Sequence, residues 1–100
     1  MLKWEMLSPQ MIDQYRYRQD TLIIDLRSKE EYDKYHIASA LHIDYEDTEA
    51  LFSLPTDKII ILCCERGASS MNRAKEMSQK GYRVKSLIGG MRAYKERRLG

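Results

Sequence analysis

Short apolar runs alternate along the chain with polar segments that carry helix signals. Residues 58–64, KIIILCC, form the most apolar run, and their apolar side chains are continuous rather than alternating. Such a run is typical of a central parallel strand that is covered on both faces. Further strands are expected at residues 21–26 (TLIIDL), 40–43 (ALHI) and 82–88 (YRVKSLI).

Residues that cap helices recur in the first half of the chain. Ser8 precedes a proline, which favours the first position of a helix. Ser28 stands three residues before Glu31, which is the spacing of a capping box. Asp44 is a third candidate cap. The helices expected from these caps cover residues 9–18, 28–35 and 44–54.

Two more helices are expected in the second half of the chain. Ser69 or Ser70 would cap a helix that ends at Gly81, and Gly89-Gly90 leads into a last helix over residues 91–99. Strands that alternate with helices at this spacing predict an α/β fold built on a parallel sheet. The apolar face of the helix before Gly81 is expected to carry Met71, Ala74 and Met77.

Length and composition are those of one ordinary globular domain. The 100 residues are 43% hydrophobic and 32% charged, which is enough chain to bury a core. No apolar run approaches the roughly 18 residues that cross a bilayer, so we expect no membrane segment. The start of the sequence lacks the apolar core of a secretory signal. We therefore expect a cytoplasmic protein, in which thiols stay reduced.

The net charge of +2 conceals an asymmetry between the two halves of the chain. Residues 1–57 carry 6 Lys and Arg against 12 Asp and Glu, whereas residues 58–100 carry 11 against 3. The basic half favours an anionic ligand or partner, although solvated helix faces would explain it equally well. No stripe of basic and aromatic residues accompanies it, so we do not expect nucleic acid as a partner.

Both cysteines stand where the most apolar run breaks into a polar loop, in the stretch ILCCERGASS. Parallel sheets bind ligands at the carboxyl ends of their strands, which is where Cys64 falls. Gly67 can adopt a backbone conformation that turns successive amides inward, with a helix N-terminus behind them. Such a site stabilises a thiolate, the reactive form of cysteine. Cys63 should point to the other face of the strand and belong to the core.

Two classes of enzyme use a cysteine in such a loop. Cysteine phosphatases need the pattern CxxxxxR, because the arginine binds the phosphoryl oxygens in a bidentate manner. Counting from Cys64, that arginine would fall on Ser70, and counting from Cys63 it would fall on Ser69. We therefore reject the phosphatase interpretation. Adjacent cysteines also lack the spaced pairs of a zinc site.

Three segments resemble those of the single-domain rhodanese-like sulfurtransferases, in order and at the family's spacing. CERGASS at residues 64–70 resembles the active-site loop, IIDLRSKEEYDKYHIASA at 23–40 a segment with the pattern hDhRxxxEYxxGHIPGA, and SLIGGMRAY at 86–94 a segment with the pattern hxGGxxxW. The chain departs from these patterns at Tyr35, at Ala38 and Ser39, and at Tyr94.

The resemblance implies a single three-layer domain over residues 1–100, with a central parallel sheet of about five strands and helices on both faces. It implies that Cys64 takes sulfane sulfur from thiosulfate or from a protein or small-molecule persulfide, and passes it to cyanide or a thiol. No metal or organic cofactor is expected, because the cysteine itself carries the sulfur. The substrate-binding loop would comprise Glu65, Arg66, Gly67, Ala68, Ser69 and Ser70.

Two alternatives to an independent enzyme remain. One is a non-catalytic binding module of the same fold, and the other is a dedicated carrier in a sulfur relay. Glu65 adds a negative charge that could oppose a dianionic donor, and Arg66 partly offsets it. We expect Asp25 and Arg27 to pair structurally, and His36 to make a structural hydrogen bond.

Overall fold

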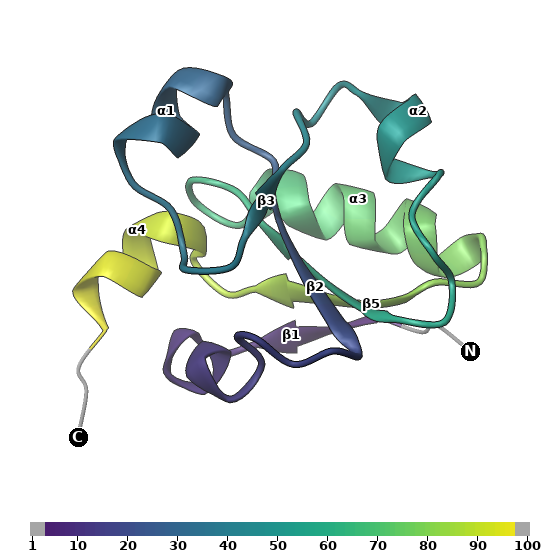
Figure 1. Cartoon of the computed structure of the whole chain (residues 1–100). Coiled ribbons are helices and arrows are strands. Elements are labelled where there is room, and N and C mark those ends of the chain that lie inside the picture. The colour runs from purple at the N-terminus through teal and green to yellow at the C-terminus, as the bar shows by residue number, and fades with distance from the viewer. Residues whose placement is uncertain (1–3, 98–100) are drawn as a thin grey trace.

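The computed structural model describes residues 4–97, which form a five-stranded sheet with helices packed against it (Figure 1). All strand pairs are parallel, and the order across the sheet is β1-β5-β4-β2-β3. This arrangement confirms the predicted α/β fold. The strands are β1 (Trp4–Leu7), β2 (Thr21–Asp25), β3 (Leu41–His42), β4 (Ile59–Cys63) and β5 (Arg83–Leu87).

Strand β4 lies in the middle of the sheet, between β2 and β5. All of its residues are buried, which explains why its sequence is apolar without alternation. In the register of the sheet, Ile61 lies beside Ile23 of β2 and Lys85 of β5. The central strand was thus predicted correctly from its composition.

Helices cover both faces of this sheet and enclose a separate core on each. One core contains Ile12 of the 3-10 helix η1 (Pro9–Gln14) and Met91 of α4 (Gly90–Glu96), packed with Ile61. The other contains Leu51 of α2 (Thr48–Leu51) and Met77 of α3 (Ala68–Gln79). Figure 1 shows α3 running along one face of the sheet. The helices η1 and α4 contact each other and pack against the opposite face. The remaining helix is α1 (Lys29–Lys34).

Several helix boundaries match the capping signals. Ser8 accepts a hydrogen bond from the amide of Gln10 at the start of η1, and Ser28 accepts one from the amide of Glu31 at the start of α1. Gly81 follows the end of α3 with a φ of +93°, as expected for a helix stop. Of the expected last helix, residues 98 and 99 lie outside the described residues.

Other boundaries differ from the expectation. The helix expected over 9–18 is a shorter 3-10 helix, and Tyr17 beyond it has a positive φ of 67°. Asp47, and not Asp44, caps α2, because its carboxylate accepts from the amide of Ala50. The side chain of Asp44 instead accepts from the amide of Glu46 within a turn.

Two further corrections concern α3 and the first strand. Gly67 is the N-cap of α3, so neither Ser69 nor Ser70 caps it, and both lie inside its first turn. Met71 is 39% exposed, whereas the other two apolar positions of the expected face are buried. Strand β1 was not predicted, because it is a short edge strand with only its last residue buried and thus carries no apolar run.

None of the helices within residues 4–97 is long and apolar enough to cross a membrane.

Candidate active site

Cys64 is the first residue beyond β4 and lies at the carboxyl end of this central strand. Its Sγ accepts hydrogen bonds from the backbone amides of Gly67, at 3.0 Å, and Ser70, at 3.4 Å. Gly67 can turn its amide toward the sulfur because its φ of +104° is accessible to glycine. The side chain of Cys64 is nearly buried, with 6% of its surface exposed. These contacts form the amide cradle that the sequence predicted.

A pair of buried serines extends this cradle. The hydroxyl of Ser70 lies 3.5 Å from Cys64 Sγ and donates a hydrogen bond to the carbonyl of Gly67. Ser86 of β5 is also fully buried, and its hydroxyl lies 2.8 Å from that of Ser70. Sequence reasoning missed Ser86, and its one signal was a hydroxyl within the strand expected over residues 82–88. The two serines fix the position of each other beneath the sulfur.

Backbone amides at the amino end of α4 bind the loop that begins at Cys64. The amide of Met91 donates to the carbonyl of Cys64 at 2.7 Å, and the amide of Arg92 donates to the carbonyl of Glu65 at 3.0 Å. Gly90, which precedes them, packs against the same two carbonyl groups. The Gly-Gly segment therefore supports the loop as well as starting a helix.

The adjacent Cys63 faces the other side of the sheet. It is fully buried in the core cluster that contains Ile12 and Met91. Burial, with a smaller contribution from the charge of Asp25, raises the pKa of the Cys63 thiol well above its ordinary value. The prediction that the two cysteines lie in different environments is confirmed.

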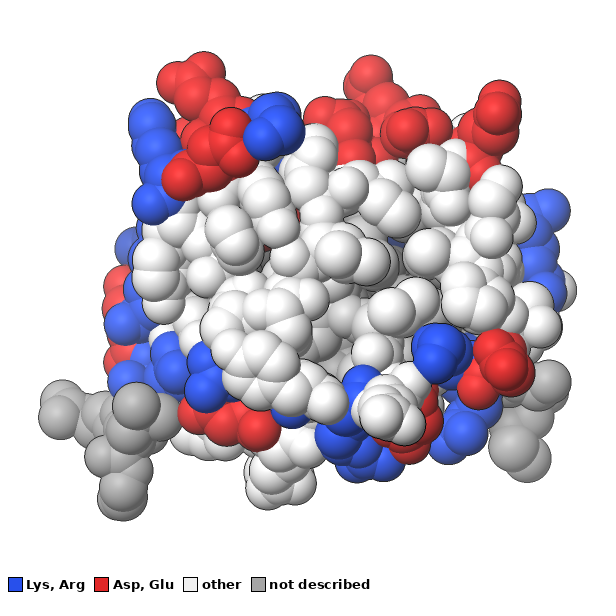
Figure 2. Space-filling view, in the orientation of Figure 1, with Lys and Arg blue, Asp and Glu red and all other residues white. Residues whose placement is uncertain are grey.

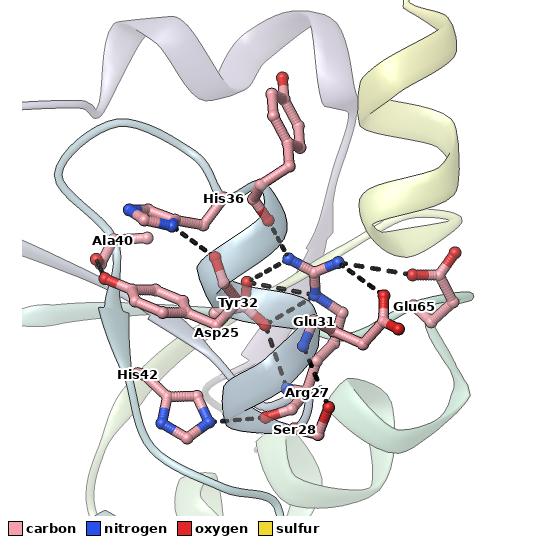
Figure 3. Close-up of polar contacts among 10 residues, drawn as sticks. Asp25, Arg27, Ser28, Glu31, Tyr32, His36, Ala40, His42 and Glu65 are labelled. Atoms are coloured by element: carbon pink, nitrogen blue, oxygen red, sulfur yellow. Dashed lines mark hydrogen bonds and ion pairs between the residues drawn. The ribbon is translucent and has the colours of Figure 1, made fainter.

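Asp25 and Arg27 form a buried pair at the carboxyl end of β2 (Figure 3). Arg27 Nε lies 3.0 Å from Asp25 Oδ1, and Nη2 lies 2.8 Å from Oδ2, while Nη2 also donates to the carbonyl of Tyr35. Burial opposes the charge of Arg27, but the hydrogen bonds and charge of Asp25, helped by Glu65 and Glu31, raise its pKa above the ordinary value. This pair ties the strand to its neighbouring loops, as expected.

The remaining nitrogen of Arg27 faces the active-site loop. Nη1 lies 3.6 Å from Glu65 and 4.0 Å from Glu31 (Figure 3). Arg27 therefore contacts Glu65 in addition to Asp25. The sequence did not predict this contact with Glu65, because the two residues are far apart along the chain.

The histidines make structural contacts in this region. His36 Nδ1 lies 2.7 Å from the carbonyl of Tyr32, and its ring stacks on the Tyr32 ring with 3.8 Å between centroids. His42 Nε2 lies 2.7 Å from the carbonyl of Arg27 (Figure 3). These contacts support the structural interpretation of His36.

A pocket of about 510 Å³ opens above Cys64. Of the predicted loop residues, Glu65 and Ser69 line it with Cys64, Gly67 and Ser70 supply amides beneath it, and Arg66 and Ala68 are exposed. Within residues 4–97, no three His, Cys, Asp or Glu side chains come together in a way that could hold a metal ion. Three further elements complete the pocket: the segment between β2 and α1 contributes Arg27, α1 contributes Glu31, and the segment before α2 contributes Tyr45.

Curated relatives of the chain are named as sulfurtransferases. The chain is 33% identical over 81 residues to thiosulfate sulfurtransferase GlpE of Coxiella burnetii, and this match covers 78% of this chain and 75% of the relative. It is 32% identical over 77 residues to the putative sulfurtransferase YtwF of Bacillus subtilis, covering 76% and 75%. It is also 38% identical over 76 residues to a tRNA sulfurtransferase of Desulfurococcus amylolyticus, where the match covers 76% of this chain but only 15% of that longer protein.

Solved structures share the fold. The reduced CoADR-RHD protein of Bacillus anthracis matches 92% of this chain and 16% of its own, with a TM-score of 0.82 and 26% identity. A rhodanese-related protein of Thermoplasma volcanium matches 92% of this chain and 91% of its own, with a TM-score of 0.82 and 20% identity, which shows the fold alone. The family model described as "Rhodanese-like domain" matches residues 8–97. The chain belongs to the rhodanese-like domain family.

Proposed function

We propose that this chain is a sulfurtransferase that carries sulfane sulfur as a persulfide on Cys64. The observation that carries the proposal is the pair of amides, from Gly67 and Ser70, that point at Cys64 Sγ from 3.0 and 3.4 Å. Fixed amide donors stabilise negative charge on the sulfur of a thiolate or a persulfide. The names of the GlpE and YtwF relatives support the same class of reaction.

The reaction has two displacement steps. In the first, the Cys64 thiolate attacks the outer sulfur of a donor, and the sulfur–sulfur bond of the donor breaks. Thiosulfate releases sulfite in this step, and a persulfide releases its thiolate. In the second step, cyanide or a thiolate acceptor attacks the outer sulfur on Cys64, and the electron pair of the breaking bond returns to the Cys64 thiolate. A metal or organic cofactor has no part in this scheme.

The loop residues have distinct parts in this proposal. Gly67 and Ser70 hold the charged sulfur through their amides, and Ser69 and Glu65 contact the donor from the wall of the pocket. Arg66 and Ala68 contact the donor from the exposed rim. We place the protein in a reducing compartment such as the cytoplasm, which would keep the Cys64 thiol from forming a disulfide between turnovers.

A sulfur relay is the second candidate, because similar domains form only 15% and 16% of two longer matched proteins. A carrier of this kind would load at Cys64 but would pass sulfur to a protein thiol more readily than to cyanide. A non-catalytic binding module would not load at all. Sulfur loading therefore separates the binding module from the other two, and the rates of transfer to cyanide and to a protein thiol separate the enzyme from the carrier.

The direct test is intact mass measurement after incubation with thiosulfate or a small persulfide, followed by peptide mapping. We expect one added sulfur on Cys64, none in Cys64→Ser, and full loading in the matched control Cys63→Ser. Sulfur on Cys63, or none with any donor, would contradict the proposal. Hydrolysis of an aryl phosphate should be negligible, because Ser70 stands where a phosphatase has its arginine.

A further inference from the structure

Three carboxylates surround Arg27, which lines the pocket above Cys64. The carboxylate of Asp25 accepts hydrogen bonds from Nε and Nη2 of Arg27. Glu31 from α1 and Glu65 from the active-site loop approach Arg27 Nη1 from the pocket side, at 4.0 and 3.6 Å (Figure 3). Both glutamates are about half exposed, with side chains at 49% and 51%. Because Asp25 already neutralises Arg27, Glu31 and Glu65 leave an excess of negative charge at this wall of the pocket.

Other carboxylates on α1 form ion pairs with lysines, and further exposed carboxylates lie before and in α2. Elsewhere on α1, Asp33 pairs with Lys29 at 2.7 Å and Glu30 pairs with Lys34 at 3.7 Å. The segment before and into α2 adds a run of four exposed carboxylates around the pocket residue Tyr45. Figure 2 shows acidic side chains along the upper edge of the molecule, over α1 and α2, with basic side chains beside those over α1. The run comprises Asp44, Glu46, Asp47 and Glu49.

The basic half of the chain does little to offset this charge at the pocket. Arg73 lies near Tyr45, but its guanidinium binds Glu76 at 2.6 Å and donates to the carbonyl of Tyr45. Arg92 faces Glu96 at 3.9 Å. Arg66 is the exposed cation within the loop itself. The excess of Lys and Arg in residues 58–100 favoured an anionic ligand, but this excess of positive charge does not extend to the pocket wall.

We propose that this pocket selects a sulfur donor that carries a cationic group beside the reacting sulfur, and that Glu31 and Glu65 determine this selectivity. This inference rests on the proposed function, since it concerns the same Cys64 step. The carboxylates attract an ammonium or guanidinium group on the donor and repel thiosulfate, which is a dianion. The reaction is unchanged: the donor's sulfur–sulfur bond breaks, its outer sulfur joins Cys64, and its inner sulfur leaves as a thiolate.

Two small persulfides of equal length provide the test. Cysteamine persulfide carries an ammonium group, and 3-mercaptopropionate persulfide carries a carboxylate at the corresponding position. We expect Cys64 to load faster from the cysteamine persulfide in single-turnover reactions followed by intact mass. Exposed charge interactions predict that Glu65→Gln and Glu31→Gln each reduce this preference about two- to fivefold, and raise loading from thiosulfate by a similar factor.

Glu30→Gln is the matched control, because Glu30 lies on the same helix, is exposed, and pairs with Lys34 away from Arg27. It should leave every loading rate unchanged. A second pair of donors, peptides with a persulfidated cysteine flanked by lysines or by glutamates, identifies the source of the cation. Preference among the small donors assigns a small aminothiol, and preference among the peptides alone assigns a basic protein surface.

The outcomes separate this inference from the proposed function. If no donor loads Cys64, the proposed function fails. If Cys64 loads at equal rates from both members of each pair, or if the two variants behave as Glu30→Gln does, the sulfur transfer stands and the selectivity inference is overturned. Thermal unfolding of each variant confirms that the compared proteins are folded.

Discussion

Replacement of Gly90 by alanine should damage both the stability and the active-site loop. Gly90 has a φ of +65°, and a Cβ placed there would lie 2.6 Å from the carbonyl carbon and oxygen of Glu65 and closer still to the carbonyl oxygen of Cys64. These are backbone atoms, held by the amides of Met91 and Arg92 at 2.7 and 3.0 Å. The loop that follows Cys64 must therefore move to admit one methyl group.

The expected magnitude has two parts. An alanine at positive φ costs about 1–2 kcal/mol, of which the lower conformational entropy of the unfolded chain returns about 0.4–1 kcal/mol. Overlap in a packed region adds about 1–3 kcal/mol. Gly81→Ala is the matched control, because Gly81 also has a positive φ, of +93°, but a Cβ there meets nothing within 4 Å. The difference between the two variants isolates the overlap.

Urea unfolding of both variants measures this difference, and activity measures the movement of the loop. We expect Gly90→Ala to be less stable than Gly81→Ala by about 1–3 kcal/mol, which corresponds to roughly 4–8 °C in Tm per kcal/mol. At a temperature where both are folded, Gly90→Ala should load sulfur more slowly, since a displacement of about 1 Å can cost up to 100-fold in rate. Gly81→Ala should load at the normal rate.

Equal stability of the two variants would refute the argument, because it would show that the loop yields without cost. Normal sulfur loading by a clearly destabilised Gly90→Ala would refute the second half alone. In that case the support of the loop by α4 would be structural and would not position the sulfur.

The other predictions concern the buried groups beneath the site. Cys63→Ser should cost about 1–3 kcal/mol, because it buries a hydroxyl in an apolar core, yet leave sulfur transfer intact in the loading assay. Burial raises the pKa of Cys63, so above about pH 8.5 the folded state keeps a proton that the unfolded state loses. The free energy of unfolding should therefore fall as pH rises, by up to about 1.4 kcal/mol per pH unit, and urea titrations under reducing conditions should show a smaller slope in Cys63→Ser. Arg27→Met should cost about 3–5 kcal/mol in urea unfolding, because it leaves Asp25 buried without its partner, and adding Asp25→Asn should restore part of the loss; an unchanged stability would contradict the structural role of the pair.

The sequence determined the central strand and the position of Cys64 at its end. Residues 59–64 are apolar on both faces, which is typical of a strand in the middle of a sheet, where both faces are covered. The position of Cys64 at the end of that strand, followed by Gly67, sufficed to predict a cradle of amides. The capping of η1 and α1 by Ser8 and Ser28 was equally accessible, because a cap depends on side chains within one turn.

The tertiary structure decided which distant residues meet this site. Strand β1 lies at the edge of the sheet and is held there by its pairing with β5. The sequence of β1 does not predict this pairing, because only its last residue is buried. The capping of α3 by Gly67 follows from the backbone turn around Cys64, and the nearby serines could not predict it. The convergence of Glu31 and Glu65 on Arg27 depends on β2 and β4 lying side by side in register, with Asp25 beside Cys63. A count of charges along the chain cannot predict which charged side chains come into contact. The interaction energy between two charges depends on their distance in space and on their burial, and both are established only when the strands pair.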